Sequence, residues 1–274
     1  MKTIIVCTDF SSEAENAVQY AASLAQENKY KLVLFHLQQI SVHALNAQVS
    51  ADYFYEQTVK NQNKMIAKTS ELHSLYSIDS RYYLASGSFF EELENCIHDH
   101  SADLVIMGMR EKTFEQKLLG DIATRAIHKI KKPLLTVPGH LQYTGIKKIL
   151  FAYDIHKNMT WSAMNDIYSF VSGFHAETEI FNVNDRLEDF TQVMNDIDLN
   201  SGYDMEDIKY SFKMIESIEV IKAIEDEITL TNPDILMMIP YQYSFLESLF
   251  HQSKTTRMAS ENKIPLLSIP LNID

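Results

Sequence analysis

The sequence lacks the features that would mark a membrane-spanning or secreted protein. No apolar stretch approaches the roughly 20 residues that a transmembrane helix needs. The first residues, MKTIIVCTDF, hold one lysine and a short strand-like run, without a signal-peptide core or cleavage site. Two cysteines, Cys7 and Cys96, are too few for a disulfide framework. We therefore expect two reduced, buried thiols in a cytoplasmic protein.

Catalytic motifs are missing as well. The sequence contains no Walker A, G-x-S-x-G or HExxH motif, and no nucleophile–base pair can be identified from spacing. We therefore predict no enzyme activity and no catalytic residue. The formal net charge of −13 argues against nucleic acid and anionic membranes as partners. Most of the acidic excess lies after residue 140, so the first half is the better host for an anionic ligand.

One short segment is present twice. Residues Pro133 to Pro138 read PLLTVP, and Pro265 to Pro270, close to the end of the sequence, read PLLSIP. Repetition at half the length of the 274-residue chain indicates two copies of one domain. We place these domains at residues 1–140 and 145–274, with a short linker between them. Each would have the usual size of a domain, about 100–150 residues.

Apolar, β-rich runs alternate with helical patterns in both halves, which predicts an α/β fold with doubly wound parallel sheets. In the first half the predicted strands are Thr3 to Thr8, Leu32 to Leu37, Arg81 to Ala85, Leu104 to Met107 and Leu134 to Val137. In the second half they are Lys148 to Ala152, Thr178 to Val183, Ile208 to Phe212, Ile235 to Ile239 and Leu266 to Ile269.

Helices are predicted between most of these strands. The first begins at a capping box in which Ser12 and Glu15 satisfy the free N–H groups of the first turn. The other predicted helices are Ser41 to Leu75, Phe89 to His98, Asp121 to Lys131, Ile218 to Ile228 and Ser253 to Asn262.

Candidate ligand-binding residues follow from this arrangement. Open α/β sheets bind ligands at the carboxyl ends of their strands, where the strand order reverses. The residues at such ends include Asp9, His36, Met107 and Gly108. Gly108 can adopt a positive φ and would let a ligand approach the backbone. Gly120 precedes a predicted helix N-terminus, which is a natural anion site.

Several segments resemble one known family. DFSSEA after the first strand, MGMREKTFEQKLLGDIATRAIHK after the fourth and the closing KPLLTV are similar to a universal stress protein domain. The pattern recurs more faintly as FAYD and FHQSKTTRMASENKIPLLSIP, so the chain resembles a tandem universal stress protein. The resemblance implies two five-stranded parallel sheets of strand order 3-2-1-4-5, with helices on both faces. Asp9 and Gly108 would then flank one crevice.

The resemblance also implies an adenine nucleotide in the first domain. Nucleotide-binding members carry G-x2-G-x9-G-[ST]; Gly108 and Gly120 match two of the glycines, while the spacer is one residue short. Glu111 replaces a glycine and Asp121 replaces the Ser/Thr, so we expect weak binding of ATP, ADP or AMP with Mg²⁺. No metal site made by protein side chains alone is expected. The implied contact residues are Thr8, Asp9, Leu37, Met107, Gly108, Arg110, Gly120, Asp121 and Ile122.

Structural roles stay open for several of these residues. Asp9 resembles the family's ribose- or metal-contacting acid, yet it also suits a turn. Asp121 suits a helix N-cap, and the lone His36 suits a structural role. His98 and His100 are a weak metal signal without a third ligand.

The second domain resembles the family less closely. Ile239-Pro240 replaces the Met-Gly step, and no glycine follows Gly202, so we expect no nucleotide there and a structural or partner-binding role. In the resembled family the last strand pairs two copies. Segments 133–138 and 265–270 would therefore join the halves as an internal pseudo-dimer, and a homodimer stays open.

The leading hypothesis is a non-catalytic, cytoplasmic stress-response module. Two alternatives remain at this stage. One is a protein that binds another small ligand or a protein partner, with a pocket between the domains or under the helices of Ser41 to Leu75. The other is a slow ATPase.

Overall fold

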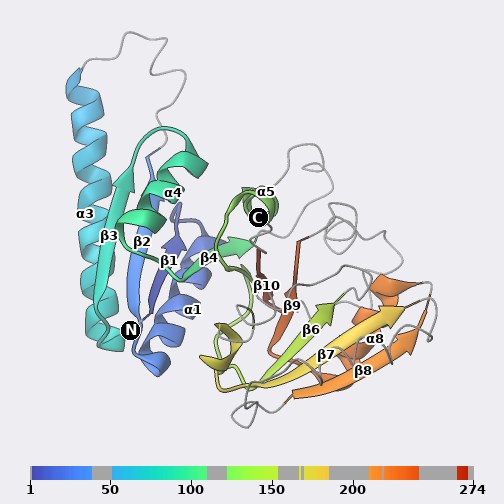
Figure 1. Cartoon of the computed structure of the whole chain (residues 1–274). Coiled ribbons are helices and arrows are strands. Elements are labelled where there is room, and N and C mark those ends of the chain that lie inside the picture. The colour runs from blue at the N-terminus through green and yellow to red at the C-terminus, as the bar shows by residue number, and fades with distance from the viewer. Residues whose placement is uncertain are drawn as a thin grey trace. The chain divides into compact units, whose positions relative to one another are not determined.

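The protein divides into two compact units, Met1–Thr144 and Gly145–Asp274, in a computed structural model of the chain (Figure 1). The structure describes residues 2–38, 51–109, 122–153, 167, 170–184, 210–217, 219–240 and 264–270.

The first unit is built around five parallel strands. They are β1 (Thr3–Cys7), β2 (Lys31–Leu37), β3 (Ser80–Ala85), β4 (Leu104–Met109) and β5 (Leu134–Pro138). Their order is β3-β2-β1-β4-β5, so the predicted α/β fold with strand order 3-2-1-4-5 is confirmed in this unit. Every residue of the central strand β1 is buried, as its continuous apolar run predicts.

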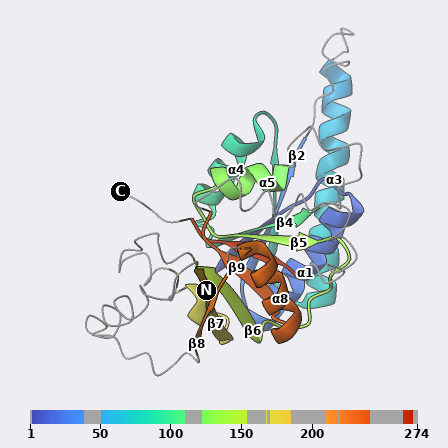
Figure 2. The same cartoon turned by 90° about the vertical axis from the view of Figure 1, so that its right-hand side faces the viewer.

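Helices cover both faces of this sheet. They are α1 (Ser12–Asn28), α3 (Ala51–Tyr76), α4 (Phe89–Asp99) and α5 (Ile122–Lys129). Figure 2 shows α1 and α3 on one side of the strands and α4 and α5 on the other. The buried side of α1 is rich in alanine, which lets the helix lie close to β1 and β4.

The start of α1 differs from the prediction. Ser11, not Ser12, is the N-cap: its hydroxyl oxygen accepts a hydrogen bond from the backbone N–H of Ala14 at 3.3 Å. The N–H of Glu15 bonds to the carbonyl of Ser11 at 2.8 Å, and the Glu15 carboxylate pairs with Lys68 of α3. The predicted capping box was therefore wrong, because Glu15 forms an interhelical ion pair instead of closing the helix end.

The second unit repeats the strand order of the first. Its strands are β6 (Lys148–Tyr153), β7 (Glu177–Asn184), β8 (Tyr210–Glu216), β9 (Ile235–Met238) and β10 (Leu266–Ser268). They are parallel in the order β8-β7-β6-β9-β10, which is again 3-2-1-4-5 when the strands of this unit are numbered from one to five. Helix α8 (Val220–Thr231) packs on β7. Ile208, Ser253 to Asn262 and residues 41–50 lie outside the described residues.

Both units use an aspartate in the same structural role. The Asp103 carboxylate accepts a hydrogen bond from the N–H of Thr3 at 2.8 Å, and its own N–H donates to the carbonyl of Thr3 at 2.9 Å. In the second unit, Asp234 accepts from the N–H groups of Lys147 and Lys148, at 2.7 and 2.9 Å, and donates to the carbonyl of Lys148 at 2.9 Å. Each aspartate precedes the fourth strand of its unit and fixes the start of the first.

The two thiols are buried and unbridged, as the sequence predicts. Cys7 lies on β1 and Cys96 on α4, and burial raises the pKa of both, that of Cys96 to about 12. Among the described helices, none is both long and apolar enough to cross a bilayer. The pairing of segments 133–138 and 265–270 stays a prediction.

Candidate functional site

The strand order reverses between β1 and β4, at the carboxyl edge of the first unit's sheet. β2 and β3 lie beyond β1 on one side, and β5 lies beyond β4 on the other. β1 and β4 pair in parallel through Ile4–Leu104, Ile5–Val105 and Val6–Ile106. This reversal is the place where an open α/β sheet offers a ligand crevice. The turn after β1 and the end of β4 border it.

Asp9 shapes the turn after β1. One of its carboxylate oxygens accepts two hydrogen bonds from Ser11, from the N–H at 3.0 Å and from the hydroxyl at 2.5 Å. The Ser11 hydroxyl oxygen in turn accepts the bond that caps α1. Asp9 itself is exposed. Its carboxylate therefore stabilises the turn after β1. Because Asp9 is also exposed to solvent, it could contact a ligand bound at this edge.

Thr8 and His36 connect the ends of β1 and β2. The Thr8 N–H donates to the carbonyl of Phe35 at 2.9 Å, and the Thr8 carbonyl lies 2.8 Å from Nδ1 of His36. A carbonyl oxygen can only accept, so Nδ1 of His36 carries a proton. His36 is buried, at 8% exposure, and its ring lies 4.7 Å from that of Phe10. These contacts give His36 the structural role that the sequence left open.

Phe10 has an unusual backbone conformation. Its φ is 62°, in the left-handed region, which is a clear outlier for a bulky residue. The hydroxyl oxygen of Thr8 accepts the Phe10 N–H at 3.1 Å, and the His36 ring packs against the Phe10 ring. The amino group of Lys64 on α3 lies 5.0 Å from the centre of the same ring, as a cation–π contact. Neither Phe10 nor Lys64 stands out in the sequence as a site residue.

Gly108 is a packing residue rather than a flexible one. Its φ lies outside the left-handed region, and it pairs with Val137 inside the ladder of β4 and β5. A Cβ atom on Gly108 would stand 2.7 Å from the carbonyl carbon of Glu13 and 3.0 Å from the nitrogen of Ala14. The expectation of a positive φ is therefore wrong. The glycine is required because the first turn of α1 lies directly against β4.

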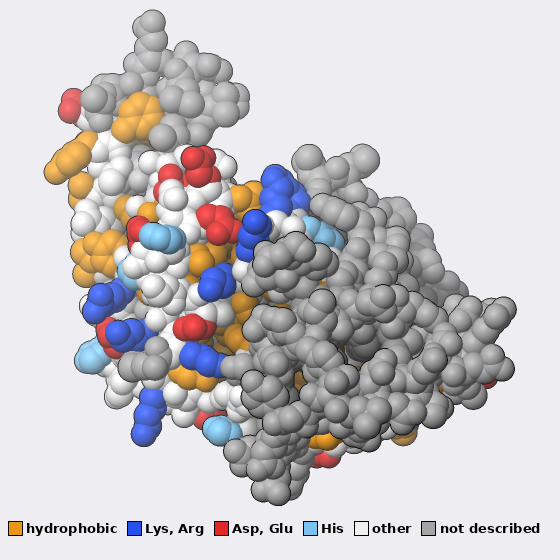
Figure 3. Space-filling model, in the orientation of Figure 1, with side chains coloured by type: hydrophobic (Ala, Val, Ile, Leu, Met, Phe, Trp, Pro, Cys, Tyr) orange, Lys and Arg blue, Asp and Glu red, His pale blue; other side chains and the backbone are white. Residues whose placement is uncertain are grey.

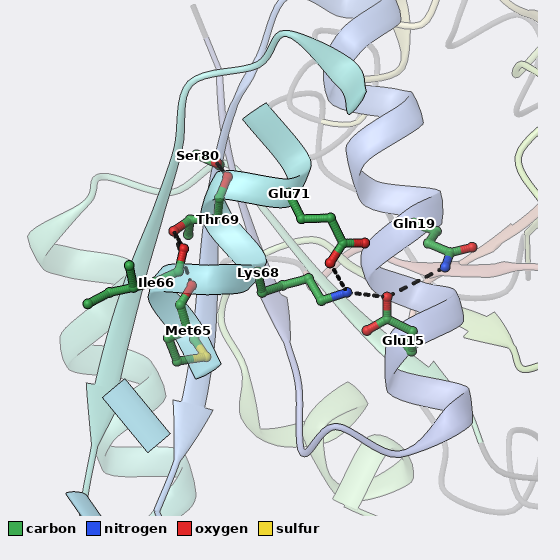
Figure 4. A network of polar contacts seen from close by, with 8 residues as sticks. All are labelled: Glu15, Gln19, Met65, Ile66, Lys68, Thr69, Glu71 and Ser80. Atoms are coloured by element: carbon green, nitrogen blue, oxygen red, sulfur yellow. Dashed lines mark hydrogen bonds and ion pairs between the residues drawn. The ribbon is translucent and has the colours of Figure 1, made fainter. Parts of the chain in front are cut away.

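Helix α3 is held over this edge by polar contacts. After β2, the Nε2 of Gln38 donates to the hydroxyl oxygen of Thr58 at 3.0 Å. Further along the helix, Lys68 reaches Glu15 of α1 at 2.7 Å and Glu71 at 2.8 Å (Figure 4). Burial alone would lower the pKa of Lys68, but the hydrogen bonds to both carboxylates outweigh it and raise the net pKa.

The structure places some of the predicted site residues and not others. Thr8 and Met107 are buried, Leu37 and Gly108 are half-buried, and Asp9 and Ile122 are exposed. Thr8, Asp9, Met107 and Gly108 lie at the reversal between β1 and β4, and Leu37 ends the neighbouring β2. Ile122 begins α5. Arg110, Glu111, Gly120 and Asp121 lie outside the described residues.

No metal centre is found in the part of the chain that the structure describes. Groups of three or more His, Cys, Asp or Glu side chains able to share an ion are absent there. His98 is exposed beside Asp99, and the His100 ring packs edge-on against Tyr83. Figure 3 shows cationic and anionic side chains interspersed on the face of the first unit that it draws.

In the second unit the corresponding edge is only partly described. Asp154, the counterpart of Asp9, lies outside the described residues. Ile239 and Pro240 follow β9 and are half-buried. Pro240 stands where the Met107-Gly108 step of the first unit has its glycine, and proline has no N–H to offer a ligand.

Comparison with known proteins decides the family. The model of the universal stress protein family matches residues 1–138. The chain belongs to the universal stress protein family. It is 29% identical over 178 residues to universal stress protein Slr1230 of Synechocystis, covering 56% of this chain and 60% of that protein. It is 27% identical over 156 residues to universal stress protein MJ0577 of Methanocaldococcus jannaschii, covering 50% of this chain and 94% of that protein.

Solved structures of other proteins share the fold. A universal stress protein from Archaeoglobus fulgidus aligns over 98% of both chains, with a TM-score of 0.69 and 14% identity. The protein PA1789 of Pseudomonas aeruginosa, described as functionally unknown, aligns over 98% of this chain and 92% of its own, with a TM-score of 0.53 and 12% identity. At these identities the likeness concerns the fold alone.

Proposed function

We propose that this universal stress protein is a tandem member of the family whose first unit binds an adenine nucleotide weakly. The observation that carries the proposal is the reversal of strand order between β1 and β4, with Asp9 and Gly108 at its borders. The ligand would be ATP, ADP or AMP, with Mg²⁺. The protein would act without catalysis, as a cytoplasmic stress-response module.

The residues at this edge suit different parts of a nucleotide. Leu37 ends β2 and Met107 lies near the end of β4, and both offer apolar side chains for a base. Asp9 is exposed and anionic, so it suits a ribose hydroxyl or a magnesium ion. The phosphates would be contacted by residues after β4, namely Arg110, Gly120, Asp121 and Ile122.

Weak affinity follows from the sequence on the phosphate side. Glu111 and Asp121 stand where nucleotide-binding members have a glycine and a Ser/Thr. An unpaired carboxylate at contact range from a phosphate opposes binding by about 1 to 4 kcal/mol. Magnesium would offset part of this repulsion. We therefore expect dissociation constants nearer the millimolar than the nanomolar range.

The second unit would have a structural or partner-binding role. It keeps the strand order of the first unit, but Ile239-Pro240 stands at the end of its fourth strand. The sequence that follows contains no glycine to cradle a phosphate. We propose that segments 133–138 and 265–270 pair the units as an internal pseudo-dimer.

Calorimetric titration tests the nucleotide proposal. ATP, ADP and AMP would each be titrated to millimolar concentration, with and without Mg²⁺, and hydrolysis would be followed by ADP release. We expect saturable heat with ATP and no ADP release above the protein-free rate. The absence of heat with all three nucleotides would contradict the proposal, while steady ADP release would make the protein an ATPase.

The variant Asp9→Asn tests the placement of the site. Asparagine keeps a side-chain oxygen for the hydrogen bonds from Ser11, so the turn is retained while the negative charge is lost. We expect weaker Mg²⁺-dependent binding of ATP with an unchanged melting temperature. Unchanged affinity in the presence of Mg²⁺ would show that Asp9 does not contact the ligand.

A further inference from the structure

Helix α3 carries a row of three lysines in the part of the helix that is tied to the end of β2 and to the first turn of α1. Lys60, Lys64 and Lys68 are spaced by four residues, so they lie on one side of the helix. Thr58 is tied to Gln38 at the end of β2, and Lys68 is tied to Glu15 in the first turn of α1. Lys64 lies between these two attachment points. Its position beside the turn after β1 is therefore fixed by the packing of the helix.

Lys64 has no ion-pair partner in the part of the chain that the structure describes. Its ammonium group forms no ion pair with any carboxylate among the described residues, whereas Lys68, one turn away, has two carboxylate partners. The amino group of Lys64 instead lies 5.0 Å from the centre of the Phe10 ring. The side chain is exposed. An anion arriving at this edge would meet an ammonium group that no described carboxylate pairs with.

Phe10 is held in a strained conformation beside this lysine. Its φ of 62° is costly for an aromatic residue, by about 1 to 3 kcal/mol. The Thr8 hydroxyl and the buried His36 ring hold Phe10 in place on the other side. Such strain persists where the surroundings over-determine it, commonly at ligand sites. Here it places a ring under Lys64, between Asp9 and Ser11.

We propose that Lys64 binds the anionic part of the nucleotide, so that α3 supplies positive charge that the acidic positions after β4 do not. This inference rests on the proposed nucleotide binding and assigns the phosphate-bearing ligand a contact from a different helix. Phe10 orients the ammonium group toward the turn at Asp9 by the cation–π contact. The site would then prefer nucleotides over nucleosides because of Lys64.

Titration of ATP and of adenosine into three variants tests this. Lys64→Met removes the charge and keeps the length of the side chain, and Lys64→Arg keeps the charge. Lys31→Met is the matched control, because Lys31 is an exposed lysine that begins β2 at the opposite edge of the sheet. We expect Lys64→Met to weaken ATP binding about fivefold, the upper range for a solvent-exposed ion pair. Adenosine binding should be unchanged, and the other two variants should bind ATP as the wild type does.

The two proposals fail in different ways. Wild-type protein that binds no nucleotide would overturn the proposed function and this inference together. Wild-type protein that binds ATP, with Lys64→Met binding it equally well, would overturn this inference alone. An equal loss of ATP and adenosine affinity in Lys64→Met would also overturn it, because the effect would then not depend on phosphate. Thermal unfolding of each variant shows whether the fold is intact.

Discussion

Gly108 of β4 lies so close to Glu13 of α1 that a Cβ atom on the glycine would stand 2.7 Å from the Glu13 carbonyl carbon. The contact is with backbone, which cannot move away without shifting the helix. Gly139 is also near Glu13, but its Cβ would meet the flexible Cγ of that side chain, at 2.9 Å. Both glycines thus contact Glu13, but Gly108 contacts its rigid backbone and Gly139 its flexible side chain.

Gly108→Ala should therefore lower the free energy of unfolding by about 1 to 3 kcal/mol, the cost of overpacking. Gly139→Ala should cost less, because the Glu13 side chain can rotate. Urea denaturation without any ligand measures both. Equal stability of Gly108→Ala and wild type would mean that α1 does not press on β4 as described.

The aspartates before β4 and β9 should be equivalent in their effect on stability. Asp103→Ala and Asp234→Ala each leave backbone N–H groups at the start of the unit's first strand without an acceptor. We expect a loss of about 1 to 3 kcal/mol for each. Trp161, the single tryptophan, belongs to the second unit, so its fluorescence reports the effect of Asp234→Ala. Circular dichroism reports the effect of Asp103→Ala. A substitution that leaves the melting curve unchanged would contradict the role.

The ion pair between Lys68 and Glu15 predicts a pH dependence. Because the folded pKa of Lys68 is raised above 10.5, its contribution is complete at neutral pH and is lost only as the pH rises through that raised value. Lys68→Met should cost about 1 kcal/mol at pH 7, since the pair is partly buried. The difference between variant and wild type should stay constant from pH 6 to 9. A difference that vanishes below pH 9 would be inconsistent with this pair.

The hydroxyl of Tyr143 is expected to lose its proton only at a pH above the ordinary tyrosine pKa in the folded protein. Its hydroxyl donates to Glu27 of α1 at 2.6 Å, and burial together with this bond raises its pKa above the ordinary value. The difference absorbance at 295 nm between wild type and Tyr143→Phe should show no tyrosinate signal up to pH 10. A signal with an ordinary midpoint near 10 would mean that residue 143 does not dock on α1.

The thiols should be unreactive in the folded protein. Both cysteines are buried, and their raised pKa values leave almost no thiolate at neutral pH. We expect a thiol reagent such as Ellman's to modify neither in the native state and both in 6 M guanidinium. Rapid labelling of either thiol in native protein would contradict the burial of that residue in β1 or α4.

Local patterns in the sequence predicted the sheet well but not the contacts that make the site. The apolar run of β1 predicts a buried parallel strand because both of its faces are apolar. The N-cap was misplaced by one residue, because the Asp9 carboxylate draws Ser11 into the capping position. The sequence pattern of a helix start does not contain that hydrogen bond.

Tertiary contacts explain the remaining differences. Gly108 was expected for its freedom of φ, whereas the close approach of α1 is what requires it. Phe10 and Lys64 are 54 positions apart and meet only because α3 is anchored at Gln38 and Glu15. A phenylalanine at position 10 and a lysine at position 64 do not by themselves predict that the two side chains are in contact. The one signal in the sequence is the spacing of Lys60, Lys64 and Lys68, which recur every four residues and so share one side of a predicted helix.

Mapping of ATP on the folded protein by amide NMR is the most direct test of the central claim, that the first unit binds a nucleotide at the carboxyl ends of β1 and β4. Resonances of Thr8, Leu37 and Gly108 should shift in a saturable way on addition of ATP with Mg²⁺. Those of β7 and α8 in the second unit should stay in place. Saturable shifts confined to β7 and α8, or no shifts at millimolar ATP, would contradict the account.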